Sequence, residues 1–427
     1  MLRHILSISS MTLPCHPGVL PTRRISEMTE INTLPVTRTD YISASLVIAS
    51  GVVAALQVGK AAIAIPALRS DFHLNLEQAG WVMSIFALLA VIGGIPVGAA
   101  ITRFGDRNLI VAGLVAIAAG SATGASTDTF HVLLAARVLE GTGLLFVVIA
   151  GSAILNRVAA REDRDLIFAF WSCYMPAGIA LAILLGLAVD GWRLFWFANA
   201  AVACLFAILL QFLVPGEAPD RARLSPGTLM NNAGRTITSA GPLLLALMFA
   251  MYGLQFFALF SFLPVLLVER IGVPHTAAGV MTALAVAANI AGNIGAGIAL
   301  RRGMPRWLLL AAASAVMTVT GIAVFLLPLP AGLLFGLCVV FSGVGGCLPS
   351  AMMGAAPRAV PEPQLGAMSV GLVMQGSNLG QMIGPVVVGS LVDAGGWQAA
   401  AMPVAIAGMV AIGNALFLRN VFRRFQL

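Results

Sequence analysis

Four side chains that can carry charge or form strong hydrogen bonds fall inside long apolar stretches of this sequence. Lys60, the only lysine in the chain, lies in the apolar run 55–72, and Gln57 precedes it by three residues. Arg137 and Glu140 have the same spacing inside another apolar run. Charges are costly in such segments and usually mark a binding site or a proton pathway. A carboxylate beside two cations releases or captures a proton when either cation moves, so Glu140 is the candidate proton carrier and Arg137 its partner.

Each of these groups also has a purely structural interpretation. The long stem of Lys60 can snorkel to the outer headgroups. Arg137 and Glu140 can form an ion pair that holds one helix against a neighbour. The chain otherwise uses arginine for its positive charge, and Gln57 lies on the same helical face as Lys60, which favours a hydrated surface over snorkelling. Two cations against one carboxylate favour an acid-bearing substrate, with Gln57, Lys60 and Arg137 as its ligands.

Uncharged hydrogen-bonding side chains recur in the apolar runs of the second part of the chain. They are Tyr252, Gln255, Asn289, Asn293, Gln375, Asn378 and Gln381. The four-residue spacing of Asn289 and Asn293 places both on one helical face. These side chains are either substrate ligands or hydrogen-bonding contacts between helices, and the sequence leaves both interpretations open. Trp171 and Tyr174 are candidates for a cavity wall, with core packing as the alternative.

The composition is that of a membrane protein. Hydrophobic residues make up 59% of the chain, charged residues make up 10%, and the mean hydropathy is +0.96. A soluble domain usually carries about 25% charged residues, and the apolar runs here are long enough to cross a bilayer as helices. We predict an all-α polytopic membrane protein with twelve transmembrane helices. The expected spans are 42–66, 79–101, 108–126, 131–154, 166–189, 193–214, 241–267, 277–300, 307–328, 331–354, 365–391 and 397–418.

The arginines indicate the orientation of these spans. Nineteen fall in the segments that are inside if the N-terminus is cytoplasmic, whereas only Arg69, Arg193 and Arg270 fall in the outside segments. This asymmetry predicts that both termini are cytoplasmic. It also explains the net charge of +7 without a nucleic-acid partner. The expected partners are therefore the lipid bilayer, protons and a small-molecule substrate.

Other classes of protein find little support. The five cysteines form no CxxC pair, so neither a disulfide framework nor a zinc site is expected. The VGK at 58–60 lacks the first glycine and the Ser/Thr of a P-loop, no HExxH occurs, and no loop could hold a catalytic domain. An enzyme is therefore not expected. Residues 1–40 are expected to form a disordered cytoplasmic tail, and Met28 is an alternative start to Met1.

An internal repeat divides the chain. Residues 79–107 match residues 278–306 at a shift of 199 positions, including glycines at 80 and 279 and arginines at 103 and 302. This predicts six-helix bundles at 41–214 and 241–418, joined by a cytoplasmic linker at 215–240 and followed by a tail at 419–427. Parallel repeats of this kind place a substrate site between the halves, and transport follows when one half rocks against the other.

Three motifs give the chain a resemblance to the major facilitator superfamily. RVLEGTG at 137–143 is similar to the Arg-x-x-Gln-Gly-x-Gly pattern of proton-linked members, and LQVGKAAIAIP at 56–66 resembles a pattern of drug antiporters. GAAITRFGDR at 98–107 resembles the gating motif, although Thr102 stands where aspartate is usual and Asp106 is a partial replacement. The gating residues implied by the resemblance are Gly98, Arg103, Gly105, Asp106 and Arg107.

The resemblance implies that spans one and four line a central cavity. Lys60 and Arg137 each lie six residues from the expected outer end of their span, about 9 Å deep at 1.5 Å per residue. We therefore expect two polar layers facing the cavity, Lys60 with Arg137 and Gln57 with Glu140.

The expected function is that of a proton-coupled antiporter that exports a small metabolite, a drug or a siderophore-like compound by alternating access. The alternative is proton-coupled uptake of a small organic or inorganic anion, and a sensor on the same fold is a further alternative. We expect a monomer in the inner membrane, driven by the proton gradient and without a cofactor.

Overall fold

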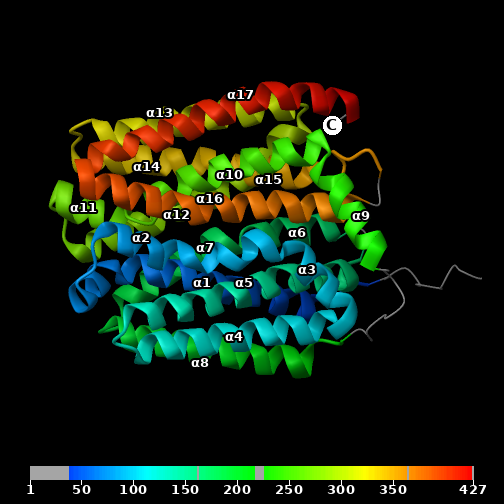
Figure 1. Ribbon diagram of the computed structural model, residues 1–427, viewed down its shortest axis with the longest axis horizontal. Coiled ribbons are helices and arrows are strands. Elements are labelled where there is room, and N and C mark those ends of the chain that lie inside the picture. Colours follow the sequence, from blue (N-terminus) through cyan, green and yellow to red (C-terminus); the bar gives the residue numbers. More distant parts are fainter. Residues whose placement is uncertain (1–37, 161–162, 217–225, 363–364, 426–427) are drawn as a thin grey trace, which may run out of the picture.

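The computed structural model describes residues 38–160, 163–216, 226–362 and 365–425. These residues are helical nearly throughout, and no strand occurs in the described ranges. The helices run along the long axis of the molecule, with the first half of the chain on one side and the second half on the other (Figure 1). The expected tail at 1–40 lies almost wholly outside the described residues.

The first half supplies the helices of the expected spans one to six, two of them broken. Between α2 and α3 a short 3-10 turn interrupts span two, and Cys173 separates α6 from α7 in span five. Pro176, which has no backbone N–H to donate, stands in the first turn after that break. The elements are α1 (Tyr41–Phe72), α2 (Leu76–Ser84), η2 (Ile85–Ala87), α3 (Leu88–Phe104), α4 (Asp106–Ser126), α5 (Phe130–Val158), α6 (Arg164–Ser172), α7 (Tyr174–Leu187) and α8 (Trp192–Leu213).

The second half follows an additional helix, α9 (Pro226–Ile237), which lies within the expected linker 215–240. Span seven is broken between α10 and α11, and span ten between α14 and α15. The helix α17 continues through most of the expected tail at 419–427. The elements are α10 (Ala240–Phe260), α11 (Leu263–Ile271), α12 (His275–Arg301), α13 (Arg306–Leu326), α14 (Ala331–Gly345), α15 (Cys347–Ala355), α16 (Gly366–Gly395), η4 (Trp397–Ala400) and α17 (Ala401–Phe425).

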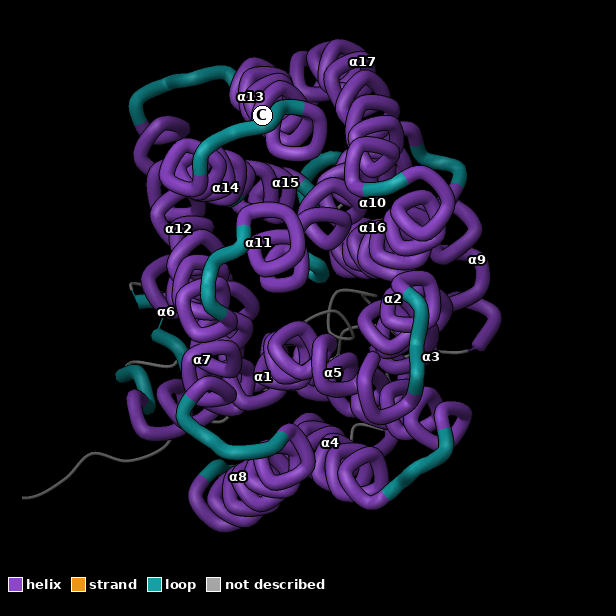
Figure 2. The backbone as a smooth tube through the Cα atoms, turned by 90° about the vertical axis from the view of Figure 1, so that its left-hand side faces the viewer, coloured by secondary structure: helices purple, strands orange, loops and turns teal. Residues whose placement is uncertain are grey.

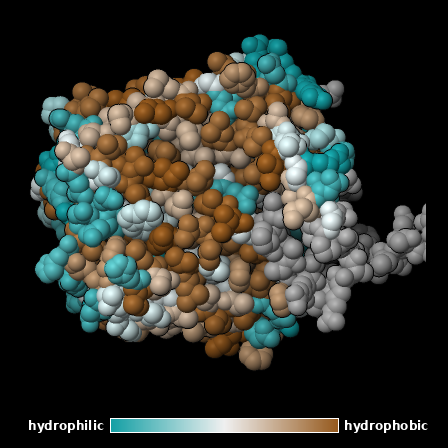
Figure 3. Space-filling view, in the orientation of Figure 1, coloured by the Kyte–Doolittle hydropathy of each residue, from teal (hydrophilic) through white to brown (hydrophobic). Residues whose placement is uncertain are grey.

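The number of crossings agrees with the twelve expected spans. Within the residues that the structure describes, ten helical segments are long and apolar enough to cross a membrane. The broken pair α6–α7 adds a shorter apolar crossing, and the 30 residues of α16 are about 45 Å long at 1.5 Å per residue. Figure 3 shows the corresponding surface, where hydrophobic side chains cover the middle of the molecule and hydrophilic ones gather towards its two ends. The protein is a multi-pass membrane protein.

The two halves meet mainly where α16 packs against α2 and α3 and where α12 packs against α7 (Figure 2). The repeated pair Gly80 and Gly279 lies at these contacts. A Cβ atom on Gly80 would come within 2.5 Å of the Pro385 carbonyl oxygen, and one on Gly279 within 2.8 Å of a Leu187 methyl carbon. Glycine therefore allows the halves to approach closely at equivalent positions of the repeat. We call the end of the molecule that carries α9 the linker end, and the opposite end the α11 end (Figure 1).

Candidate functional site

Lys60 is enclosed in a cluster of side chains from the first half. Its Nζ donates to Glu140 Oε1 at 2.5 Å and to Ser121 Oγ at 2.6 Å. The Trp196 ring lies 4.3 Å from Nζ, which is the range of a cation–π contact. No part of Lys60 is exposed. The ammonium is therefore held by α4, α5 and α8, and the snorkelling interpretation is wrong.

Arg137 binds the other oxygen of the same carboxylate. Its NH1 donates to Glu140 Oε2 and, at 2.9 Å, to the backbone carbonyl oxygen of Gln57. Its Nε donates to the Val82 carbonyl oxygen at 3.1 Å, and its Cζ lies 5.5 Å from the centre of the Phe86 ring. Glu140 thus bridges two cations, and the three side chains together carry a formal charge of +1 with no exposed surface.

Small residues on α4 make room for the carboxylate. A Cβ atom on Gly120 would come within 2.6 Å of Glu140 Cγ. The next residue, Ser121, has its Oγ 2.8 Å from Glu140 Oε1 and 3.0 Å from Gln57 Oε1. Because this hydroxyl accepts from Lys60 and has a single proton to donate, it can satisfy only one of those two oxygens at a time. The cluster therefore has two alternative hydrogen-bond arrangements.

Lys60 is directed away from the interface between the halves, whereas Arg137 reaches the Val82 carbonyl oxygen of α2. In Figure 2, α4 and α8 lie on the side of α1 and α5 that is remote from the second half. Lys60 reaches toward these helices, so the expectation that it faces a cavity between the halves is wrong. The expected layers are also wrong in their pairing, because Lys60 pairs with Glu140 instead of Arg137. Opposite charges attract strongly in a low-dielectric interior, whereas two cations side by side repel each other.

The second half repeats the uncharged part of this arrangement. Ser121 on α4 lies 3.0 Å from Gln57 Oε1, and Thr318 on α13 lies 3.5 Å from Gln255 Oε1 on α10. In both glutamines Nε2 is buried and has no hydrogen-bond partner in the described part of the chain. The charges, in contrast, occur only in the first half's version of the arrangement.

Two of the other predicted ligands form a contact between helices. Asn289 Nδ2 donates to the Tyr252 hydroxyl at 3.1 Å and to the Ser342 carbonyl oxygen at 3.1 Å, which links α12 to α10 and α14. Asn293 Nδ2 continues the chain by donating to Asn289 Oδ1 at 2.9 Å. These bonds support the structural interpretation of Tyr252 and Asn289, and a role in substrate binding stays a prediction.

The remaining predicted ligands lie apart from the charge cluster. Gln375 of α16 lies against Gly94 of α3, across the boundary between the halves. Asn378 donates to the Met374 carbonyl oxygen of its own helix at 2.8 Å. Tyr174 stacks on Trp171 with ring centres 4.9 Å apart. Gln375 thus lies at the interface between the halves.

The expected gating loop forms an ion pair and hydrogen bonds within the first half. Gly105 has φ +80°, a conformation that glycine adopts readily, and Asp106 begins α4 there. Asp106 Oδ2 accepts from Arg157 at 3.0 Å, and Arg157 NH2 also donates to the Pro215 carbonyl oxygen at 2.8 Å. The loop is thereby tied to the end of α5 and to the start of the linker. Arg107 NH1 lies 3.5 Å from the Val214 carbonyl oxygen. Gly98 and Arg103 belong to α3, and the side chain of Arg103 lies outside the described part of the structure.

Sequence reasoning missed three residues that the structure makes important. Ser121 and Trp196 contact the Lys60 ammonium. The only sequence signal for them was that a polar residue and a tryptophan each stand within an apolar span. Asp393 accepts from the backbone N–H groups of Leu76 at 3.2 Å and Glu77 at 2.9 Å, so it adds a second cap, from the other half, to the start of α2 that Asn75 already caps. The repeated Val-Asp sequence at the end of spans five and eleven was a signal for Asp393.

A bundle of apolar helices in two repeated halves, with charges buried inside one of them, is the architecture of a secondary membrane transporter. Comparison with known proteins agrees with this class, because residues 47–369 match the model of the Major Facilitator Superfamily. The chain belongs to this family. It is a transporter and not an enzyme.

Individual relatives carry out several kinds of transport. The chain is 27% identical over 373 residues to the 3-(3-hydroxy-phenyl)propionate transporter of Escherichia coli, covering 85% of this chain and 90% of the relative. It is 31% identical over 241 residues to the chloramphenicol resistance protein of Streptomyces lividans, covering 55% and 60%. Among solved structures, an inward-facing and occupied bacterial homolog of the human lysosomal transporter Spinster matches with a TM-score of 0.68 at 19% identity, covering 90% of this chain and 95% of that one.

Proposed function

We propose that this transporter couples the movement of a small organic molecule to protons, and that the proton is exchanged at Glu140. The observation that carries this proposal is the enclosed cluster in which Glu140 bridges Lys60 and Arg137. A purely structural pair needs one cation for one carboxylate. Here a third charge is buried with no exposed surface, which is costly and is usually retained for a function.

The geometry supports a coupling role in which Lys60 transmits the movement of α1. Lys60 extends from α1, whereas Glu140 and Arg137 belong to α5. A shift of α1 relative to α5 changes the distance between Nζ and the carboxylate, and with it the cost of protonating Glu140. The Ser121 hydroxyl can donate either to Glu140 or to Gln57. The carboxylate can therefore lose this hydrogen bond while the hydroxyl keeps an acceptor. Because the three side chains have no exposed surface, the substrate acts on them through helix movement.

The proposal is tested by proton flux into liposomes that contain the purified protein, with separate pools of small acids, neutral compounds and cations added outside. Glu140→Asp keeps the charge and withdraws the carboxylate by one methylene, and Lys60→Met removes the cation that belongs to α1. We expect substrate-triggered proton flux in the wild type and its loss in both variants, while binding of the same substrate persists. Unchanged flux in both variants would make the cluster a structural element and overturn the proposal.

Export of a drug-like compound by antiport is the second candidate, and it was the preferred expectation from the sequence. The observation in its favour is the match to the chloramphenicol resistance protein over 241 residues. The relative that covers more of the chain moves a carboxylate instead. The direction of proton flux in the same liposome assay separates antiport from symport, because protons leave the compartment that the substrate enters only in antiport.

A further inference from the structure

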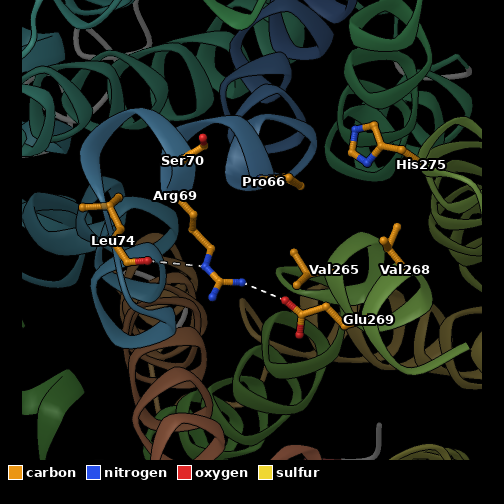
Figure 4. Close-up of a pocket in the computed structure, with 8 residues that line it drawn as sticks. All are labelled: Pro66, Arg69, Ser70, Leu74, Val265, Val268, Glu269 and His275. Atoms are coloured by element: carbon orange, nitrogen blue, oxygen red, sulfur yellow. Dashed lines mark hydrogen bonds and ion pairs between the residues drawn. The ribbon is translucent and has the colours of Figure 1, made fainter. Parts of the chain in front are cut away.

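A cavity of about 370 Å³ lies at the α11 end, between the two halves. Its volume is in the range of pockets that hold small molecules. Figure 4 shows that side chains from both halves line it. The lining residues are Pro66, Arg69, Ser70, Leu74, Val265, Val268, Glu269 and His275. None of them belongs to the charge cluster around Glu140 or to the predicted substrate ligands.

One ion pair crosses this cavity and joins the halves. Arg69 NH1, from α1, lies 2.9 Å from Glu269 Oε1, from α11. The two side chains are 29% and 43% exposed, so both are within reach of a solute from the water. A partly exposed pair of this kind contributes little stability, because water and salt screen it. A ligand that offers Arg69 a better partner can therefore displace Glu269.

The chemistry of the cavity favours a carboxylate with a compact apolar body. The direction of Arg69 is restrained by the segment that follows α1, since its Nε donates to the Leu74 carbonyl oxygen at 3.4 Å. A guanidinium whose direction is fixed binds carboxylates with paired hydrogen bonds. The walls beside it are apolar, supplied by Pro66, Val265 and Val268. An amine would have to bind Glu269, whose polar partner in the described structure is this same arginine.

We infer that the cavity is a binding site for the carboxylate group of the transported molecule, and that the ligand opens the α11 end by taking the place of Glu269 on Arg69. This inference rests on the proposed transport function and adds the substrate class to it. Displacing Glu269 removes one contact between α1 and α11, while the cap that Asp393 places on α2 remains. The ligand thus weakens the closure of this end when it binds.

Binding to the purified full-length protein, measured by calorimetry without a proton gradient, tests the inference. The probes are 3-phenylpropionate, the neutral 3-phenylpropanol and the cationic 3-phenylpropylamine. We expect the wild type to bind the carboxylate in preference to the other two. Arg69→Gln should weaken carboxylate binding about 10- to 100-fold, the usual worth of a hydrogen-bonded charge partner, and Glu269→Gln should strengthen it by removing the competitor.

A matched control is available at the same end of the molecule. Arg193 is also a partly exposed arginine with an acidic partner, Asp128 at 2.6 Å, but it lies outside the cavity. Arg193→Gln should leave binding of 3-phenylpropionate unchanged. Equal binding by the wild type and Arg69→Gln, or a preference for the amine, would overturn the inference.

The two proposals fail in different ways. Proton-coupled movement of 3-phenylpropionate that is indifferent to Arg69 and Glu269 would refute the cavity as a site and leave the coupling proposal standing. Binding that depends on Arg69 without any proton flux would refute the coupling at Glu140 and support the cavity.

Discussion

The buried cluster holds two cations and one carboxylate, so removing Glu140 and removing Lys60 should affect the stability of the protein differently. Glu140→Gln leaves Lys60 and Arg137 facing each other's charge without a counterion, in a site with no exposed surface. Removing one partner of a buried ion pair costs about 3–5 kcal/mol. Lys60→Met, in contrast, leaves Arg137 and Glu140 as a balanced pair, and Ser121 stays within hydrogen-bond distance of the carboxylate.

The expected loss for Lys60→Met is therefore smaller. It removes one hydrogen bond between charged groups, worth about 1.5–3 kcal/mol, and also removes the cost of burying the ammonium, which offsets part of that loss. Methionine fills nearly the same volume beside Trp196, so little cavity is created. We expect Glu140→Gln to lower the thermal midpoint of the detergent-solubilised protein more than Lys60→Met does.

The double variant gives the sharper result. Adding Lys60→Met to Glu140→Gln removes one of the two unbalanced cations, so the double variant should be more stable than Glu140→Gln alone. The measurement is a double-mutant cycle on thermal midpoints, followed by fluorescence-detected size-exclusion chromatography. The reasoning is refuted if the two single variants lower the thermal midpoint equally. It is also refuted if the double variant lowers the midpoint by the sum of the two single decreases, because charge balance then does not determine the stability of the cluster.

Three further outcomes follow from contacts elsewhere. Gly141→Ala should cost about 1–3 kcal/mol, because its Cβ would collide with the Phe86 backbone, whereas Gly413→Ala, which meets no neighbour, should be neutral or stabilising in a thermal-midpoint assay. Asp393→Ala should cost about 0.5–2 kcal/mol by depriving the Leu76 and Glu77 N–H groups of this carboxylate, while Asn75 still caps α2, and should raise the accessibility of the α11 end to a thiol reagent on an introduced cysteine. Hydrogen bonds from the Thr39 and Tyr41 hydroxyls lower the pKa of Asp163 below its usual value of 3.8. The contribution of these bonds to the free energy of unfolding is therefore fully present above pH 3.8 and is lost as the pH falls through the lowered pKa of the folded state. The stability difference between wild type and Asp163→Asn should therefore be constant near neutral pH and vanish in strong acid.

The sequence by itself determined the class of this protein. Apolar runs of about 20 residues can satisfy their backbone groups in a bilayer only as helices, so composition and run length lead directly to the multi-pass helical fold. The repeat at 79–107 and 278–306 predicted two related halves, and its equivalent glycines Gly80 and Gly279 both lie where the halves touch closely. The charges that matter could also be found in the sequence, since a lysine or a glutamate inside such a run is rare.

The tertiary structure decided which way those charges point and which partners they have. Helical spacing places Gln57 and Lys60 on one face of α1, but it does not say whether that face meets the second half or the helices α4 and α8. That choice depends on the rotation of α1 in the bundle, which is set by packing over the whole helix. The link from Arg69 to Glu269 likewise joins residues 200 positions apart, and no local pattern encodes such a distance. Residue type and hydropathy are local properties, whereas partnership and direction exist only once the helices are packed.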